Sequence, residues 1–318
     1  MELEKIIASS ADFLNIVEEI KSGKLAKSIL LISKDELYAF QFAKLLASSI
    51  FAGGEVMQDE HFEKVQALAH PDLKIYPAKD RLMVADSDNI VEESAVKPIF
   101  ANKKVFIIKH IDNGLEQAQN KLLKTLEEPA SNVFFILTTS NLHLVLPTIR
   151  SRCNKIELGK LPLSTIKPIF VGYENVDLIL ALSEGYLGKA LALAKKENLG
   201  QIFDAVMSVV CKMKTSKYLL QFSKKLIDLK ENLNFLLEIM SMIFEDLLLI
   251  KAGKSNRARF KNYVQELKFV EGEYSVKAIA QIRSLIDNAV KELSYSGNAT
   301  VVLENLLLNI LEVKYICR

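Results

Sequence analysis

Clusters of the residues that hold metals or form disulfides are missing from this sequence. Its three cysteines are far apart and odd in number, no CxxC pair occurs, and the four histidines are scattered. This pattern argues against a disulfide framework and against a clustered zinc site. We expect all three cysteines, Cys153, Cys211 and Cys317, to be reduced thiols of a cytoplasmic protein.

Long apolar runs and a large excess of one charge are missing as well. The most apolar stretches, such as Leu247–Ile250, are short and flanked by charge, so no membrane span is predicted. The first ten residues contain Glu2 and Glu4, so we expect no signal peptide. The 41 Lys and Arg residues nearly balance 39 Asp and Glu. A net charge of +2 is too small for the whole surface to attract nucleic acid, so DNA contact requires a local patch.

The N-terminal half has the pattern of an α/β protein. Up to about residue 160, short apolar runs typical of buried strands alternate with segments of helical spacing. The predicted strands are Ser28–Ser33, Leu73–Tyr76, Val105–Ile108 and Val133–Thr138, and the predicted helices are Ala39–Ile50, Val91–Phe100 and Leu115–Leu126, the last ended by Pro129. Such alternation predicts a mainly parallel sheet with helices on both faces.

Beyond Pro162 almost everything has helical period. About three short helices are predicted up to Leu199, and five or six longer ones from Gln201 suggest a bundle. We therefore predict an α/β domain at 1–160, a small helical domain at 161–200 and an all-α C-terminal domain at 201–318.

Three linked segments carry a resemblance to a known family. They read NKLLKTLEEP at 120–129, VFFILTT at 133–139 and LPTIRSRC at 146–153. In this order they resemble the hallmark block of bacterial DNA polymerase III clamp-loader subunits, which are AAA+ proteins. Weaker similarity extends over most of the chain, at 21–28, 70–73, 185–191 and 298–307. The resemblance implies an AAA+ (RecA-like) domain, a small helical lid and a C-terminal helical collar that joins subunits.

The loop that would bind nucleotide lacks its defining residues. A P-loop needs glycines for close approach to phosphate, a lysine for the β- and γ-phosphates and a hydroxyl for magnesium. At this spacing after Ser28–Ser33, the four positions are occupied by Lys34, Ala39, Phe40 and Gln41. Asp35 and Glu36 would in addition repel a triphosphate. We expect a loop that merely joins strand to helix.

The resemblance places the magnesium-binding end after Val105–Ile108, where an ATPase relative has an Asp and a second acidic residue. Here the two residues are Lys109 and His110, with Asp112 the only carboxylate nearby. A lysine cannot coordinate a hard cation, and we expect Asp112 to be a helix N-cap rather than a lone metal ligand. The phosphate-binding and the magnesium-binding halves of the nucleotide site are therefore both lost. This indicates the non-hydrolysing member of the family, which keeps the Ser-Arg-Cys (SRC) motif. We expect no ATP or magnesium in cis and no intrinsic activity.

Ser151, Arg152 and Cys153 resemble the family's SRC motif, whose arginine acts on a neighbouring subunit's nucleotide. An arginine finger stabilises the charge that develops on the transferring γ-phosphate, and guanidinium suits this role because it stays ionised. The resemblance implies that Arg152 is this finger. The alternatives are that Arg152 is a surface arginine in a salt bridge, or that Arg150 is the finger. Cys153 is expected to be a small buried residue.

Other family features are absent or without a partner. The interval Phe51–Ala69, where relatives carry a four-cysteine zinc module, has no cysteine and only His61, so zinc is not expected. Thr138 and Thr139, at the end of the sensor-1 strand, are expected to serve structure alone. Lys189, in the sensor-2 segment, either pairs with a local carboxylate or approaches DNA phosphate.

The function that the resemblance implies is that of a non-hydrolysing subunit of a DNA polymerase holoenzyme, at the cytoplasmic replisome. Its partners would be gamma/tau and delta subunits, the sliding clamp and primed DNA, without a membrane. DNA would be held through backbone phosphates. Lys103, Lys104 and Lys109 are candidates, although a solvated charged face explains them equally well. The alternatives are an active AAA+ ATPase with an unusual site, an adaptor outside the clamp loader, and the delta subunit itself.

Overall fold

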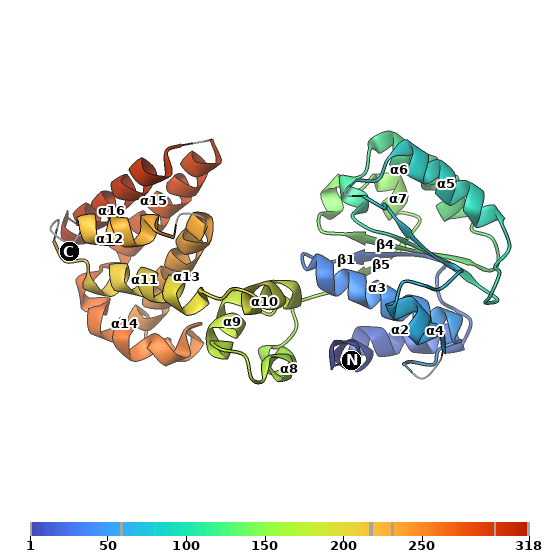
Figure 1. Cartoon of the computed structure of the whole chain (residues 1–318), viewed down its shortest axis with the longest axis horizontal. Coiled ribbons are helices and arrows are strands. Elements are labelled where there is room, and N and C mark those ends of the chain that lie inside the picture. The colour runs from blue at the N-terminus through green and yellow to red at the C-terminus, as the bar shows by residue number, and fades with distance from the viewer. Residues whose placement is uncertain are drawn as a thin grey trace. The chain divides into compact units, whose positions relative to one another are not determined.

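The computed structural model describes residues 2–57, 60–79, 81–215, 219–229, 232–295 and 297–316. The chain folds as two compact units, drawn in Figure 1: Met1–Val171 with Gly185–Leu191, and Gly172–Glu184 with Ala192–Arg318. Both units contain part of 161–200, and the three-domain division stays a prediction. Cys317 lies outside the described residues.

The first unit is built on the predicted parallel sheet. Five strands lie in the order β2-β3-β4-β1-β5, and every neighbouring pair is parallel. Their bounds are β1 Ser28–Ile32, β2 Leu73–Tyr76, β3 Lys104–Ile108, β4 Val133–Thr139 and β5 Asn154–Glu157. Since all strands run the same way, their carboxyl ends share one edge, where ligands of such sheets bind.

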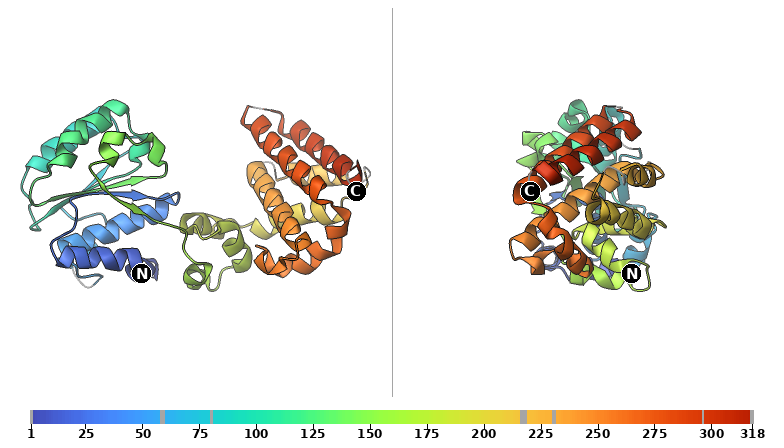
Figure 2. Two further views of the ribbon diagram at one scale, coloured as in Figure 1. Left: turned by 180° about the vertical axis from the view of Figure 1, so that it is seen from behind. Right: turned by 90° about the vertical axis from the view of Figure 1, so that its left-hand side faces the viewer.

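Helices cover both faces of this sheet, as Figures 1 and 2 show. One face carries α1 (Glu2–Ala8), α2 (Ala11–Lys21), α3 (Glu36–Phe51) and α4 (Glu60–Gln66), and the other carries α5 (Val84–Ala95), α6 (Glu116–Glu127) and α7 (Pro147–Arg150). The core under α5 and α6 contains fully buried Phe106 and Phe135, whose rings stack with centroids 5.2 Å apart. The predicted α/β class is confirmed.

The sequence predictions for this unit are wrong or incomplete in several places, since α1, α2 and α4 were not predicted. The helix expected at Val91–Phe100 is α5, which begins at Val84 and ends at Ala95. Pro98 has no backbone N–H and disfavours a helical conformation in the residue before it, and the Asp72 carboxylate accepts the backbone N–H groups of Ile99, Phe100 and Ala101 at 2.6–2.7 Å. Strand β5 was not predicted, because it is an exposed edge strand without an apolar run.

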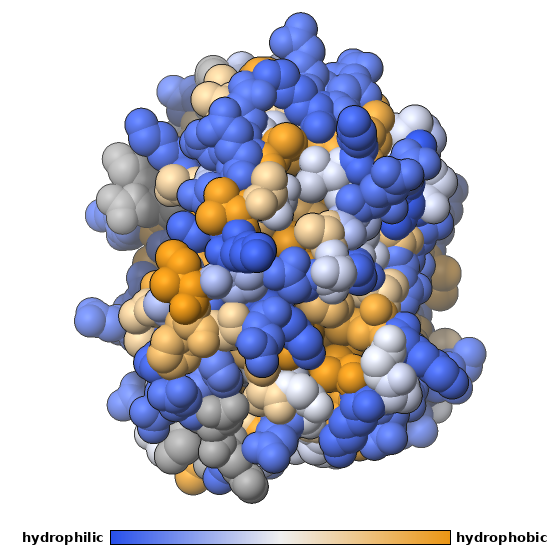
Figure 3. Space-filling model, turned by 90° about the vertical axis from the view of Figure 1, so that its right-hand side faces the viewer, coloured by the Kyte–Doolittle hydropathy of each residue, from blue (hydrophilic) through white to orange (hydrophobic). Residues whose placement is uncertain are grey.

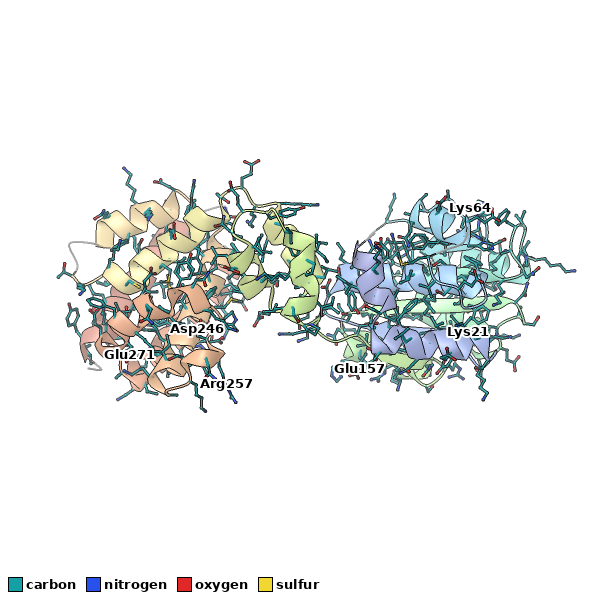
Figure 4. All side chains as sticks on the ribbon, turned by 90° about the horizontal axis from the view of Figure 1, so that it is seen from below. Lys21, Lys64, Glu157, Asp246, Arg257 and Glu271 are labelled. Carbon is teal, nitrogen blue, oxygen red and sulfur yellow. The ribbon has the colours of Figure 1, made fainter. Side chains whose placement is uncertain are left out.

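The three short helices predicted up to Leu199 are α8 (Leu163–Ile166), α9 (Val176–Ser183) and α10 (Leu187–Ala194). The second unit then continues as the predicted helical bundle. Its helices beyond α10 are α11 (Leu199–Lys212), α12 (Leu219–Ile227), α13 (Leu233–Lys251), α14 (Val264–Val270), α15 (Val276–Ser294) and α16 (Ala299–Ile316). Asp246 lies inside this unit, whereas Arg257 points outward (Figure 4). The Asp246 carboxylate accepts the backbone N–H groups of Arg259 and Phe260, which fastens the segment before α14 to α13.

The surface is polar with scattered apolar side chains. Figure 3 shows one face on which apolar side chains gather in small patches among charged ones. None of the helices in the described part of the chain combines the length and the apolarity that a bilayer crossing requires.

A buried ion pair fixes the last helix in the second unit. Lys314 of α16 is 1% exposed, and its Nζ lies 2.6 Å from Glu273 Oε2. The same ammonium donates to the Met213 carbonyl at 3.1 Å and lies 4.6 Å from the centroid of the Tyr274 ring. Burial alone would raise the pKa of Glu273, but its hydrogen bonds with Lys314 and Lys214 hold this pKa below its usual value.

Replacing Lys314 by methionine is therefore expected to lower the free energy of unfolding by about 3 kcal/mol, because the Glu273 carboxylate, which is only 19% exposed, loses its main partner. Lys214 is the matched control: it also pairs with Glu273, but its side chain is 53% exposed. Lys214→Met is expected to cost under about 1 kcal/mol. Urea denaturation followed by circular dichroism measures both, and equal losses would contradict the assignment.

Candidate functional site

The connection between β1 and α3 is short and closed by hydrogen bonds. It consists of residues 33–35, without glycine. Asp35 is the N-cap of α3, and its Oδ1 accepts the backbone N–H of Tyr38 at 3.1 Å. A P-loop offers such N–H groups to a phosphate. Here a carboxylate of the chain itself takes one of them.

Three of the four residues at the P-loop positions lie at the start of α3 rather than in a loop. Lys34 is exposed in the bend before the helix, Ala39 is buried, and Phe40 and Gln41 are half-buried. Lys109 follows β3, and its Nζ lies 5.5 Å from the centroid of the Phe40 ring. The structure therefore brings together the residues at the phosphate-lysine position and the magnesium-aspartate position. They interact as a cation with an aromatic face.

His110 lies beside this pair with a left-handed backbone, φ 50°. Its backbone N–H donates to Thr138 Oγ1 at 3.1 Å, and its Nδ1 is 3.4 Å from Glu36 Oε1. Thr139 Oγ1 accepts the backbone N–H of Asn141 at 3.2 Å. Both threonines thus hold the turns at the carboxyl edge of the sheet.

Asp112 does not have the role that the sequence predicted. It lies in a 3-10 turn, Ile111–Asn113, and α6 begins only at Glu116, so Asp112 is too far away to be the N-cap of α6. Its Oδ2 instead accepts the N–H groups of Ser140 and Asn141, at 3.2 and 3.0 Å, and the Ser140 hydroxyl at 3.0 Å. Asp112 therefore joins the turns after β3 and β4.

These turns border a cavity of about 550 Å³. Its lining mixes cationic, acidic and amide side chains: Glu36, Lys79, Lys109, His110, Asp112, Asn113, Ser140, Asn141 and Leu144. An ammonium group stands where the family's first metal ligand would be, and one oxygen of Asp112 is occupied by three donors. Among the described residues, no group of three or more His, Cys, Asp or Glu side chains is arranged to hold a metal ion.

Arg152 is not among the residues that line this cavity. It follows α7, and its Nε and Nη2 both lie 2.7 Å from Glu127 Oε2. Its Nη1 donates to the Thr148 carbonyl at 3.0 Å, as does the Ser151 hydroxyl at 3.1 Å. The guanidinium thus has an ion-pair partner in the isolated chain, yet its side chain is 30% exposed.

Cys153 anchors the SRC segment in the core. Its side chain is buried in the cluster under α5 and α6, and burial raises the pKa of its thiol to about 12, an effect that Lys155 only partly offsets. A thiol of such a high pKa is unreactive at neutral pH. Cys153 therefore positions Arg152 through packing.

The candidate DNA-binding lysines make contacts within the chain. Lys104 is buried, and its Nζ donates to the carbonyls of Glu93 and Val96 at 3.0 Å. Lys103 Nζ donates to the Ile50 carbonyl at 2.8 Å, and burial lowers the pKa of this amine. Neither lysine belongs to a freely solvated charged face. Lys189, the other basic residue singled out, lies in the first turn of α10.

An aromatic cluster occupies the region where relatives carry zinc. Phe51 stacks on His70 with ring centroids 3.9 Å apart, and Phe100 meets both His61 and His70 edge-on. His70 Nδ1 accepts the backbone N–H of Asp72 at 3.2 Å, so the neutral ring carries its proton on Nε2. That proton is donated to His61 Nδ1 at 2.9 Å.

Protonation of His70 would add a proton at Nδ1, and the new N–H would then face the backbone N–H of Asp72. Burial, together with His61, lowers the pKa of His70 to about 4. The unfolded chain therefore binds a proton between about pH 6.5 and 4 that the folded chain does not, so stability falls as the pH falls through this window.

We expect this effect to contribute about 2–3 kcal/mol between pH 7 and 4. In His70→Phe the loss of stability on acidification should be smaller by this amount, whereas His143→Gln, which changes an exposed histidine, should behave as the unmodified chain. Thermal denaturation at a series of pH values tests this. A parallel pH dependence for all three proteins would contradict it.

Comparisons with known proteins agree with the sequence resemblance. Residues 10–162 match the family model described as DNA polymerase III, delta subunit. The chain is 23% identical over 314 residues to DNA polymerase III subunit delta' of Bacillus subtilis, covering 93% of this chain and 94% of that protein. It is 28% identical over 268 residues to DNA polymerase III subunit gamma of Buchnera aphidicola subsp. Schizaphis graminum, covering 74% of each.

The fold has a counterpart among solved structures. A DNA polymerase III gamma subunit-related protein from Thermotoga maritima superposes with a TM-score of 0.51 at 19% identity. The match covers 94% of this chain and 99% of that one. At this identity the likeness concerns the fold alone, a parallel sheet covered by helices and followed by further helices.

Proposed function

Because residues 10–162 match the DNA polymerase III delta subunit model and the chain is similar to a delta-prime subunit along nearly its whole length, we propose that it is a clamp-loader subunit and the non-hydrolysing member of that complex. In this role it supplies Arg152 in trans to the ATP held by a gamma/tau subunit, while the complex loads a sliding clamp on primed DNA. Delta is a further partner, and the complex works at the cytoplasmic replisome.

The observation that carries this proposal is the pairing of Lys109 with Phe40. In a hydrolysing relative these two positions provide the carboxylate for magnesium and the lysine for the β- and γ-phosphates. Here an ammonium group and a phenyl ring occupy the same region, 5.5 Å apart. Magnesium would be repelled and triphosphate would lose its main cation. The same contact argues against an active ATPase with an unusual site.

The finger role of Arg152 is supported by its state in the isolated chain. The guanidinium is held by a single carboxylate, Glu127, and by the Thr148 carbonyl, so its fork of donors is already oriented. Glu127 is 54% exposed, and such an ion pair is worth little in water. A neighbour's γ-phosphate, with more charge and more oxygens, therefore displaces Glu127 at small cost. The salt bridge and the finger are successive states of one side chain.

Arg152→Ala in a ring reconstituted with gamma/tau and delta is expected to lower DNA-stimulated ATP hydrolysis and clamp loading, with normal assembly by size-exclusion chromatography. The fall should be smaller than the ~10³–10⁵ seen when some GTPases lose a finger, because only one of several ATP sites is affected.

Arg150→Ala is the matched control, since it removes an equal charge two residues away, and full turnover is expected. Glu127→Gln tests the exchange of partners: it removes the charge of the carboxylate that holds Arg152 and should leave turnover intact or raise it. Unchanged turnover in Arg152→Ala would remove the finger assignment, and a fall in Arg150→Ala alone would move it to Arg150. Failure of the unmodified chain to join the ring would favour an adaptor outside the clamp loader.

A further inference from the structure

One carboxylate in the first unit binds the amino ends of two helices. Asp35 Oδ1 accepts the N–H of Tyr38 at 3.1 Å, which caps α3, and Oδ2 accepts the N–H of Gly188 at 2.9 Å, in the first turn of α10. Asp35 is 7% exposed. The N–H groups at the start of a helix have no partner within it, and the helix dipole favours a negative charge there. Asp35 thus satisfies two such ends at once.

The approach of α10 requires a glycine at position 188. A Cβ atom there would lie 2.6 Å from Asp35 Oδ1 and 3.1 Å from the Leu37 Cβ. The backbone of Gly188 is not in the left-handed region, so its conformation alone would allow other residues. Close packing on Asp35 and Leu37 is therefore what demands glycine, and nothing in the nucleotide chemistry does.

We propose that Asp35 is a positioning residue that holds the start of α10 against the start of α3 without nucleotide. This inference rests on the proposed function, in which the chain binds no nucleotide of its own. The family resemblance assigns 185–191 to the sensor-2 segment, which in an ATPase contacts the γ-phosphate. Here the chain supplies its own anion at the amino end of that helix. The contact between α3 and α10 is therefore permanent rather than controlled by hydrolysis.

Other groups near Asp35 do not provide the same contact. The Ser33 hydroxyl accepts the N–H of Asp35 at 3.1 Å and so orients it. Glu36, the next carboxylate, instead lies beside His110, with its Oε1 3.4 Å from the His110 Nδ1. The two oxygens of Asp35 are each directed at one helix, an arrangement that a residue with a single acceptor oxygen cannot reproduce.

Asp35→Ser separates the capping of α3 from the contact with α10. Serine is a good N-cap, as Ser275 is for α15, where its Oγ accepts the N–H of Ala278 at 3.1 Å. One short hydroxyl cannot also reach Gly188. Hydrogen exchange measured by NMR on the full chain should accelerate at least about tenfold at Gly188, the loss expected for one hydrogen bond to a charged group. Exchange within α3 should stay unchanged.

Gly188→Ala tests the same contact from the other helix, because the added methyl group pushes against Asp35 while α3 keeps its cap. Exchange at residue 188 should again rise. Gly159→Ala is the control, since a Cβ at that position meets no atom within 4 Å. Asp35→Glu should restore less protection than aspartate, because its longer side chain cannot fit the same two bonds.

Unchanged exchange at residue 188 in both Asp35→Ser and Gly188→Ala would overturn the proposal, whatever Arg152 does in the ring. The proposal would also be overturned if ATP with magnesium reversed the faster exchange in Asp35→Ser. In that case nucleotide would still control the position of α10. Acceleration in both variants, insensitive to ATP and absent from Gly159→Ala, supports it. The exchange is measured on the chain alone, so its outcome is independent of the ring assay of the finger.

Discussion

The hydrogen bond between the Asp35 carboxylate and the amide of Gly188 is the interaction that, as we propose, limits what the carboxyl edge of this sheet can bind. In a nucleotide-binding relative of this fold the amino end of the first helix is kept open for phosphate. In this chain a fixed negative charge already occupies that end and is 7% exposed. Lys109 lies over the Phe40 ring, in the region where phosphate and magnesium bind in such a relative. Phe40 and Lys109 thus contact each other within the chain, as expected of positions that serve structure rather than nucleotide binding.

The function that we propose depends on Arg152, which has kept its place while the nucleotide-binding residues have not. While the groups for binding nucleotide in cis are replaced, the SRC segment keeps a buried cysteine as anchor and an exposed ion pair at its tip. A buried anchor fixes the direction of the segment, and a weak exposed ion pair leaves the guanidinium available. A subunit that supplies a finger to its neighbour, as we propose for this chain, would need both properties. It would not need to change shape with its own nucleotide.

Sequence patterns predicted those parts of the structure that depend on nearby residues. The strand Val105–Ile108 was evident as a fully apolar run, and the spacing from the first strand was enough to place Phe40 where the P-loop lysine would be. The contact between Asp35 and Gly188 joins residues 153 positions apart, and no local signal reveals it. Asp35, before α3, is a residue type that commonly caps helices, yet from the sequence we expected it only to repel a triphosphate. Likewise, no pattern indicated that His70 would stack on Phe51.

The most direct measurement of the central claim is a calorimetric titration of the purified chain with a non-hydrolysable ATP analogue, with and without magnesium. If the chain's own side chains occupy the phosphate and magnesium positions, no magnesium-dependent heat should appear at micromolar concentrations of the analogue, and Phe40→Ala should not create any. Saturable micromolar binding that depends on magnesium would contradict the account, because phosphate would then have displaced both Asp35 and Lys109.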